Sequence, residues 1–381
     1  MKVIVNAARV LVGLLFIFSG LVKANDPIGL AYKMQEFFLV WGLSVLDGIA
    51  LPLSVLMIAF EIFAGAALLL GWKKKSISWL LLLLILFFTF LTGYAYLSGK
   101  FKNCGCFGDC IPITAGQSFI KDVLLLLLIL IIFFNTRYIK PLFSKGLTTV
   151  LLLLVTVFSF ASQWYTLQFL PVADCLPLKK GNSIPAQLKM PANAVPDSTV
   201  ITFIYEKQGK KVEFTADAFP DDFDDSLYQF VDRYDKVIRP GKNNEPPLKN
   251  FAISAADGTD MGASLLRYPQ VLVLFVENAT TVDQWKKRFE KMYPAIAEKN
   301  ISFYMVTSTK PALEKAIAGA NFDGSPIWTG DATMIRIAAR TNPTLYLLKN
   351  GVVEGKWSYR NFDDALETIH NLATETRIGT P

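Results

Sequence analysis

The sequence predicts a multi-domain membrane protein, in which an α-helical transmembrane bundle of about five spans precedes an extracytoplasmic α/β domain. Two observations support this fold class. The 381 residues are 52% apolar with a mean hydropathy of +0.37, which is more apolar than is usual for a soluble protein. Long apolar runs fill the chain before Pro171, and charged sequence typical of a soluble domain follows it. This change in composition places the main boundary between two units near residue 171.

The spans follow from the length of the apolar runs, because a helix that crosses the bilayer core needs about 20 mainly apolar residues. Five stretches meet this requirement, at roughly 3–22, 51–72, 76–98, 119–135 and 147–170. The fourth is short and can be extended into the preceding sequence IPITAGQS. The aromatic, amphipathic segment 27–47 is better explained as an interfacial helix or loop than as a span.

Basic residues in the short loops predict the orientation. They follow the second span at 73–75 and the fourth span at Arg137, Lys140 and Lys145. Both loops and the N-terminus should then be cytoplasmic, in a bacterial inner membrane, and the loop 99–118 and the C-terminal half should be periplasmic. The net charge of +6 comes largely from lysines beside the spans, so the lipid bilayer is an expected partner and nucleic acid is not.

The loop 99–118 contains the sequence NCGCFGDC, with three of the four cysteines, and Cys175 follows the last span. On the oxidising side of the membrane such cysteines tend to form disulfides. One arrangement combines a strained, easily reduced Cys104–Cys106 bridge with a Cys110–Cys175 bridge that ties the loop to the segment after the fifth span. A Cys106–Cys110 bridge, with Cys104 or Cys175 as the resolving thiol, is supported by the sequence about as well as the first arrangement.

These four cysteines are the candidate catalytic residues, and three interpretations of them stay open. They form inert structural bridges, or a redox-active thiol–disulfide site, or a zinc site with four thiolates. The zinc site is the least favoured, because oxidation competes with metal binding outside the cell, and we expect no metal. Gly105 and Gly108 permit the tight backbone that such a loop requires.

Arg9 and Glu61 are the charged residues placed most firmly within predicted spans. Each costs at least ~2.5 kcal/mol at the centre of a bilayer, so that an isolated charge is disfavoured. We therefore expect Arg9 and Glu61 to form an ion pair between the first two spans. Such a pair either fixes the packing of the helices or serves as a proton relay or a polar contact for a bound quinone, which is the cofactor to consider.

Three motifs carry a resemblance to a known family: ARVLVGLLFIFSGLVKANDPIGLA at 8–31, FEIFAGAALLLG at 60–71 and CGCFG at 104–108. They resemble the DoxX-like membrane proteins, and most closely the branch that includes the methylamine-utilisation protein MauE. The resemblance covers residues 1–145. It implies a bundle that works in the cell envelope beside thioredoxin-like proteins and helps disulfides to form in a partner enzyme. It does not make methylamine relevant to this chain.

The sequence after the fifth helix (146–171) begins with a linker rich in proline and small residues, at 172–197, which we expect to run along the membrane surface. Segment 199–219 predicts a strand pair that turns at Gln208–Gly209. FDDSLYQFVDRYDKVI, at 223–238, suits a short helix. Together these elements form the predicted region 172–247, which precedes the α/β domain.

From residue 248 to the end, strands and helices alternate, and a hairpin and a helix close the chain. A first strand and turn are expected in 250–266, and further strands at 270–278 and 301–309. The last two strands form a hairpin in 342–358 that turns at Asn350–Gly351. The expected helices are 281–300, 312–320, 331–339 and 361–375. Pro294 should kink or end part of the first of these helices. The pattern predicts a three-layer α/β domain.

This order, together with TNPTLYLLKNG at 341–351, resembles a thioredoxin-fold domain of the TlpA-like kind. In that family a cis-proline faces the active cysteines, and Pro343 matches its position. The CxxC motif should follow VLVLFV, but ENATTVDQW stands there and no cysteine follows Cys175. The domain therefore cannot carry out dithiol exchange by itself, and we expect it to dock a peptide or protein through the surface around Pro343 or to act as a structural cap.

Two functions from different classes fit these observations. In the first, the chain is a thiol–disulfide or quinone-linked oxidoreductase of the cell envelope, and its cysteine loop exchanges electrons with a quinone or a thioredoxin-like partner. In the second, it is a membrane scaffold with structural disulfides and a docking domain. The clustered cysteines and the resemblance favour the first; the missing CxxC favours the second.

Overall fold

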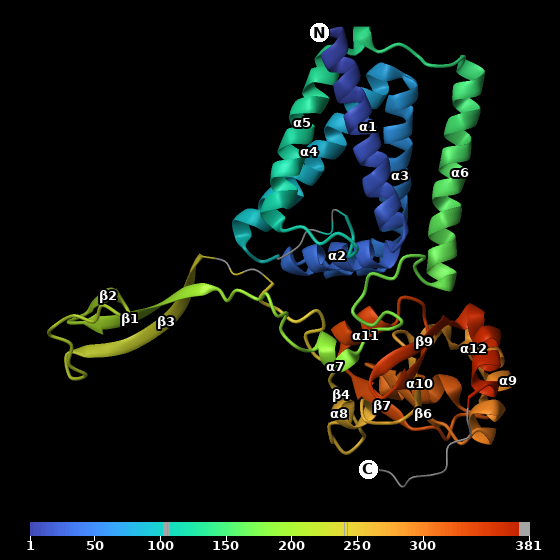
Figure 1. Ribbon diagram of the computed structural model, residues 1–381. Helices are drawn as coiled ribbons and strands as arrows, with labels where there is room; N and C mark the ends of the chain where they lie inside the picture. The colour runs from blue at the N-terminus through green and yellow to red at the C-terminus, as the bar shows by residue number, and fades with distance from the viewer. Residues whose placement is uncertain (102–104, 106, 240, 242, 373–381) are drawn as a thin grey trace.

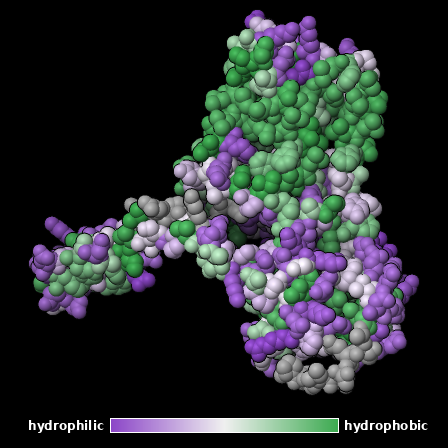
Figure 2. Space-filling model, in the orientation of Figure 1, coloured by the Kyte–Doolittle hydropathy of each residue, from purple (hydrophilic) through white to green (hydrophobic). Residues whose placement is uncertain are grey.

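The computed structural model (Figure 1) describes residues 1–381 except 102–104, 106, 240, 242 and 373–381, and for residues 236, 237 and 239 it describes the backbone alone. Five long helices form the membrane part: α1 (Lys2–Ala24), α3 (Ala50–Leu70), α4 (Lys74–Ser98), α5 (Ala115–Phe134) and α6 (Lys145–Phe169). Each is long and apolar enough to cross a membrane. The prediction of five spans followed by a mixed α/β region is confirmed. Figure 2 shows that the visible surface of the bundle is mostly hydrophobic, as contact with lipid requires.

The segment between α1 and α3 does not run along the bundle. Helix α2 (Pro27–Val40) lies across the end of the bundle nearer the α/β domain (Figure 1), and a short 3₁₀ helix η1 (Ser44–Ile49) leads into α3. Asp26 begins α2 by accepting a hydrogen bond from Gly29 N at 3.0 Å, which satisfies one of the free amides at a helix N-terminus. The fourth span starts at Ala115, within the preceding sequence, because Thr114 and Gln117 form a capping box there.

The C-terminal domain is built on a six-stranded sheet in the order β4–β7–β6–β5–β8–β9. Its strands are β4 (Ile253–Ser254), β5 (Val271–Phe275), β6 (Ser302–Thr307), β7 (Ile327–Gly330), β8 (Thr344–Lys349) and β9 (Val352–Ser358). The neighbours β5, β6 and β7 are parallel, and the other pairs are antiparallel. Strand β7 has no counterpart among the strands predicted from the sequence.

Helices cover both faces of this sheet, as the three-layer prediction requires. One core joins Leu272 and Leu274 of β5 to α9 (Val282–Glu298), α10 (Lys310–Ile317) and α12 (Phe362–His370). The alternate residues of β5, such as Val273, face a second core with α8 (Gly262–Leu265) and α11 (Ala332–Ala338). Strand β5 is buried on both faces, which explains its continuous apolar sequence. Helix α9 does not end at Pro294.

Part of the predicted linker belongs to the α/β domain. Leu178 and Ile184 are buried in the second core, the short helix α7 spans Ile184–Gln187, and Ser183 pairs with Val352 at the start of β9. The chain after α6 is therefore held against the domain over these residues.

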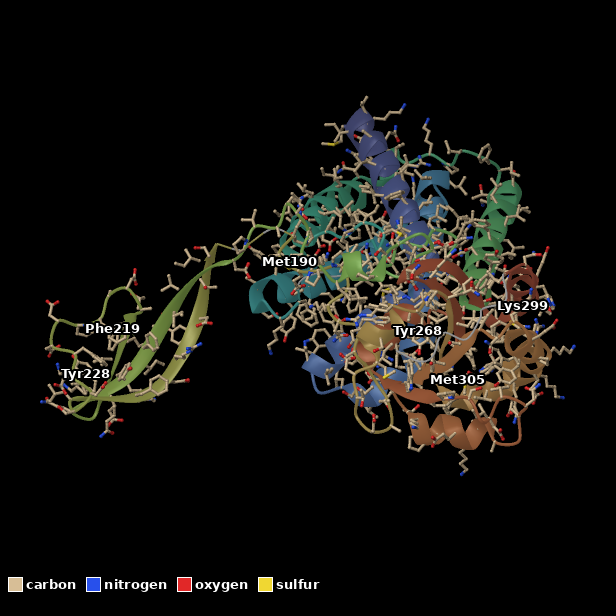
Figure 3. The ribbon with its side chains drawn as sticks, turned by 60° about the horizontal axis from the view of Figure 1, so that its bottom comes forward. Met190, Phe219, Tyr228, Tyr268, Lys299 and Met305 are labelled. Carbon is tan, nitrogen blue, oxygen red and sulfur yellow. A yellow bond between two sulfur atoms is a disulfide. The ribbon has the colours of Figure 1, made fainter. Side chains whose placement is uncertain are left out.

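Three antiparallel strands form a separate arm, which we define as residues 198–239. Its order is β2 (Lys210–Thr215), β1 (Ser198–Lys207), β3 (Tyr228–Arg239). The arm projects sideways from the rest of the molecule (Figures 1 and 3). The turn at Gln208–Gly209 has positive φ at both residues, as the predicted strand pair requires.

The helix predicted at 223–238 is wrong, because most of this segment is strand β3. Tyr228 and Phe230 pack against Tyr205 of β1, with ring centroids 6.3 and 5.6 Å apart. Phe219 and Phe223, from the loop before β3, join the same cluster at 4.8 Å from one another. Backbone pairing with β1 and this aromatic cluster override the local preference for helix, because strands are stabilised by their neighbours.

Candidate functional site

A cavity of about 110 Å³ lies inside the membrane bundle, between α1, α2, α3, α4 and α5. Apolar and aromatic side chains make up most of its wall, among them Phe16, Met34, Phe37, Phe38, Trp41, Phe87, Phe88, Leu91 and Phe107. Seven polar or charged side chains complete it: Ser19, Lys23, Lys33, Glu61, Thr92, Lys121 and Asp122. An apolar cavity with a few polar groups is the usual form of a small-molecule site.

The first charged pair in this cavity joins α1 to α3. Lys23 Nζ lies 2.5 Å from Glu61 Oε1 and 2.7 Å from Oε2, and both side chains are at most 4% exposed. The Ser19 hydroxyl donates to Glu61 Oε2 at 3.3 Å. Glu61 is therefore paired with Lys23, and the expected pair with Arg9 is wrong.

The packing of α1 against α3 explains this correction. A Cβ on Gly13 would lie 3.1 Å from Gly65 O, and a Cβ on Gly20 would lie 2.5 Å from Ile62 Cγ1. These close approaches, which small residues permit, place Glu61 level with Gly20. Arg9 stands eleven residues earlier on α1, or about 16 Å along the helix.

Arg9 instead caps the end of α3. Its Nε donates to Leu68 O at 2.9 Å, its Nη2 donates to Leu69 O, and its Nη1 donates to Lys140 O at 3.1 Å. Carbonyl groups at a helix C-terminus lack partners within the helix, and a cation there also complements the helix dipole. The structure thus places Arg9 away from the cavity that Glu61 lines.

The second charged pair lies at the start of α5. Lys121 Nζ is 2.6 Å from Asp122 Oδ1, and Asp122 Oδ2 accepts a hydrogen bond from Thr92 of α4 at 3.0 Å. Lys121 Nζ also lies 5.3 Å from the centroid of the Phe107 ring, within range of a cation–π interaction. This pair was not predicted from the sequence, although both residues lie within the predicted span 119–135.

The cysteine loop contributes to the same cavity. Gly105 and Phe107 line it, and in the sequence they flank Cys106; Cys104 and Cys106 themselves lie outside the described residues. Gly105 has φ +68°, and a Cβ there would lie 3.0 Å from Lys33 Cγ of α2. Glycine therefore allows the loop to approach α2 closely.

The other two cysteines form a disulfide between Cys110 and Cys175, as in the first of the two predicted arrangements. The Cys106–Cys110 bridge of the alternative arrangement is not compatible with it. Asn25 lies beside the disulfide: its Nδ2 donates to Ala173 O at 2.8 Å, and its Oδ1 accepts from Ala173 N at 2.9 Å. The cysteine loop is thus fixed to the segment that follows α6.

Arg340 of the α/β domain binds two carboxylates of the membrane part. Its Nε lies 2.9 Å from Asp26 Oδ2, and its Nη2 donates to Asp109 Oδ2 at 2.8 Å. The Arg340 side chain is 4% exposed. Burial raises the pKa of Asp26, although the charge of Arg340 opposes this effect; burial lowers the pKa of Arg340, but the two carboxylates more than offset it.

Further contacts continue this interface on either side. The Tyr32 hydroxyl of α2 donates to Glu277 Oε2 at 2.7 Å, and the Arg336 guanidinium lies 5.1 Å from the Tyr32 ring. Lys356 Nζ is 2.7 Å from Asp174 Oδ2, and burial lowers the pKa of Lys356, with the Asp174 charge opposing it. No pattern in the sequence identified these partners.

Pro343 lies at this edge of the domain. The Asn342–Pro343 peptide bond is cis, as the resemblance implies, and Pro343 is buried. Asn342 Oδ1 accepts a hydrogen bond from Glu277 N at 2.9 Å, and Glu277 stands in the position after β5 where a CxxC motif was expected. The edge that carries Pro343 therefore faces the chain's own membrane part, and its docking role remains a prediction.

Fold and site together define a polytopic membrane protein with a cysteine loop beside an intramembrane cavity and with an α/β domain bound to that loop. Comparison with known families agrees with the membrane part: residues 1–135 match the family described as methylamine utilisation protein MauE. Residues 199–240, a range that includes nearly all of the arm, match a domain of unknown function, DUF8463. The MauE match confirms that part of the resemblance seen in the sequence.

A curated relative is Protein TlpB of Flavobacterium psychrophilum, which is 33% identical over 129 residues. The alignment covers 33% of this chain and 35% of the relative, so the chain spans about a third of the length of the curated protein that it matches. No solved structure gave a significant match.

Proposed function

We propose that this chain is a thiol–disulfide redox protein of the bacterial inner membrane, in which Cys104 and Cys106 oxidise the thiols of a partner protein in the periplasm. The observation that carries the proposal is the cavity, because it combines buried ion pairs with Gly105 and Phe107, the residues on either side of Cys106. Charged residues inside a membrane are costly and usually functional. The MauE-type membrane region supports the same role.

The four cysteines then have separate tasks. Cys110 and Cys175 form a structural bridge, which leaves Cys104 and Cys106 as the exchanging pair. A partner thiolate attacks the Cys104–Cys106 disulfide and forms a mixed disulfide, and the partner's second thiolate resolves it. The partner gains a disulfide, and Cys104 and Cys106 become thiols.

The cavity residues fit a quinone ring. Aromatic side chains such as Phe37, Phe88 and Phe107 offer faces for stacking. Lys23 and Lys121 supply ammonium groups, which have three donors each, and Glu61 and Asp122 keep these charges paired inside the bilayer. A bound quinone would take up two electrons and two protons from the Cys104 and Cys106 thiols, which restores their disulfide and yields the quinol.

The α/β domain holds the loop in place in this proposal. The order β6–β5–β8–β9, with the cis peptide directly before β8, supports the resemblance to a thioredoxin-type domain. The chain has no cysteine after Cys175, so the domain serves as a cap or a docking element and not as an exchanger. Arg340, through Asp109, fixes the loop beside Cys110.

A mass-tagged thiol reagent tests the proposal. The purified full-length protein is treated with a mild dithiol, and the tags are counted before and after addition of a short-chain quinone. We expect two tags to appear on reduction and to disappear with quinone, and we expect neither change in Cys104→Ser or Cys106→Ser. The double variant Cys110→Ser/Cys175→Ser lacks the structural bridge. It should still show both changes, the gain of two tags on reduction and their loss with quinone.

Two results together would exclude the redox function. The cysteines would stay paired after treatment with the mild dithiol, and the Cys104→Ser and Cys106→Ser variants would still support oxidation of a partner. The scaffold function is then the better explanation. It is supported by the contacts that Arg340 and Glu277 make with the membrane part.

A further inference from the structure

Strand β3 of the arm has one free edge. Strand β1 lies between β2 and β3, so β3 pairs with β1 alone, and within the described residues no strand covers its other side. This edge is twelve residues long, from Tyr228 to Arg239. A long free edge presents unpaired backbone donors and acceptors and is a template for pairing with another strand.

The sequence of β3, YQFVDRYDKVIR, has a pattern that is complementary to itself about Tyr234. One step from Tyr234 stand Arg233 and Asp235, and two steps away stand Asp232 and the lysine at position 236. Three and four steps away, every residue is apolar: Val231 with valine 237, and Phe230 with Ile238. Relative to β1 the strand has an extra residue at Val231 and at Ile238, so its regular alternation is confined to the residues between them. When two copies of β3 run antiparallel about this centre, each arginine 233 therefore faces an aspartate 235, and opposite charges stabilise such cross-strand pairs.

Other registers do not have this property. Residues directly opposite one another in a sheet point to the same face, so a two-fold pair of identical strands must be centred on a residue. Centring on Arg233, or on Asp235, places like charges directly against one another, which is destabilising. Only the register centred on Tyr234 places Arg233 opposite an acidic residue, Asp235.

Because the arm projects sideways from the molecule, two copies in one bilayer can bring their arms together. Figure 1 shows the arm extending sideways from the long axis of the bundle. Two copies in one membrane are related by an axis along the membrane normal, and a two-fold axis brings two sideways arms together at equal height and in opposite directions. That geometry is the antiparallel one that the charges favour.

We propose that the arm is a homodimerisation element, in which the β3 strands of two copies pair antiparallel about Tyr234 and join two three-stranded sheets into one of six strands. Pairing provides hydrogen-bond partners for the backbone N–H and C=O groups at the outer edge of β3. It also covers apolar side chains that are exposed in the single chain, with Phe230 58% and Ile238 64% exposed. The occupant of the edge is thus a second copy of this chain.

Charge reversal tests the register in the full-length protein, in nanodiscs or mild detergent, with the dimer fraction measured against concentration. Arg233→Asp and Asp235→Arg each place like charges opposite one another twice per dimer, and each should raise the dissociation constant about tenfold. The double variant Arg233→Asp/Asp235→Arg restores opposite charges and should restore dimerisation. Lys210→Asp, which makes the same change of charge as Arg233→Asp but at the start of β2, is the matched control and should have no effect.

Cross-linking tests the centre of the pair independently of stability. Tyr234→Cys places two thiols opposite one another and should give a covalent dimer under mild oxidation. Glu213→Cys removes the same hydrogen bond, between the Tyr234 hydroxyl and Glu213 Oε2, but stands on β2 and should give none. A wild-type chain that stays monomeric at all concentrations, a double variant that fails to recover, or equal cross-linking at both positions overturns the proposal. The proposal is also overturned if the edge of β3 pairs with a different protein and not with a second copy of this chain.

Discussion

In the membrane bundle, Lys23 binds Glu61 across 38 residues of sequence and both face a cavity, whereas at the interface with the α/β domain Arg340 reaches Asp109 across 231 residues. Both sites bury a cation against carboxylates. The bundle pair forms part of the wall of that cavity. The Arg340 site instead joins the cysteine loop and the start of α2 to the α/β domain.

The difference separates two uses of a buried charge. An ion pair that lines a cavity keeps donors that a ligand can use, and its removal should affect ligand chemistry as well as stability. An ion pair between two domains fixes their arrangement, and its removal should affect that arrangement first. Buried ion pairs are weak evidence for net stability, because replacing both partners by apolar residues is often neutral. Substitutions at the two sites can therefore distinguish the two roles.

The largest effect is expected for Glu61→Leu. It leaves the Lys23 ammonium unpaired inside the bundle, which costs about 3–5 kcal/mol when one partner of a buried pair is removed. The double variant Lys23→Met/Glu61→Leu should recover most of the unfolding free energy, measured by denaturation in detergent, but should not recover oxidation of the loop thiols by quinone. Full recovery of both properties would make the pair purely structural.

A smaller effect is expected for Arg340→Met, about 2–3 kcal/mol, because Asp109 keeps some contact with solvent while Asp26 stays buried. The α/β domain should then separate more readily from the bundle, which limited proteolysis of segment 170–197 would detect. Arg336→Met is the matched control on the same edge. Its ion pair with Glu277 is 3.8 Å long and its side chain is 45% exposed, so the expected cost is about 0–1 kcal/mol. Equal effects of the two variants would contradict a special role for Arg340.

Filling the cavity should affect function more than stability. Leu91→Trp adds volume at a residue that lines the cavity, and it should slow oxidation of the loop thiols by quinone about tenfold, equivalent to ~1.4 kcal/mol. Leu83→Trp, on the same helix α4 but 59% exposed on its outer surface, should leave the rate unchanged. Stopped-flow measurement of quinol formation compares them, and an equal rate in both variants would exclude the cavity as the quinone site.

The smallest effect is a dependence of stability on pH through Asp26. Its pKa is raised by burial above the ordinary value of 3.8, so between the two values the folded state binds more protons than the unfolded state. The contribution of Asp26 to the free energy of unfolding is therefore largest below pH 3.8 and is lost as pH rises through the folded pKa. Denaturation curves across this interval should show that slope in the wild type and not in Asp26→Asn. A slope of opposite sign would mean that the charge of Arg340 outweighs burial.

Much of the membrane part could be predicted from the sequence. The spans depend on the length of local apolar runs, and all five appear at the expected places. The start of α5 at Ala115 also follows from a local signal, the capping box of Thr114 and Gln117. The cavity could be found only in part: Glu61 was recognised because a carboxylate in a span is rare, but Lys121 and Asp122 were overlooked near the end of a span.

The errors have one physical cause. The partner of Glu61 depends on how α1 packs against α3, which close contacts at Gly13 and Gly20 set. The segment 223–238 becomes mostly strand because β1 and an aromatic cluster lie beside it. In both cases a contact between distant segments outweighs the local preference of the chain.

The sequence by itself determined where this chain crosses the membrane, where its cysteines gather and where strands and helices alternate in the α/β domain, because these features depend on residues close together in the chain. Only the tertiary structure decided that Lys23 pairs with Glu61 and that Arg340 binds Asp26 and Asp109. It also decided that, among the described residues, no strand pairs with the outer edge of β3. Those pairings join segments far apart in the sequence, and helix packing and strand register select among many partners that charge alone would allow.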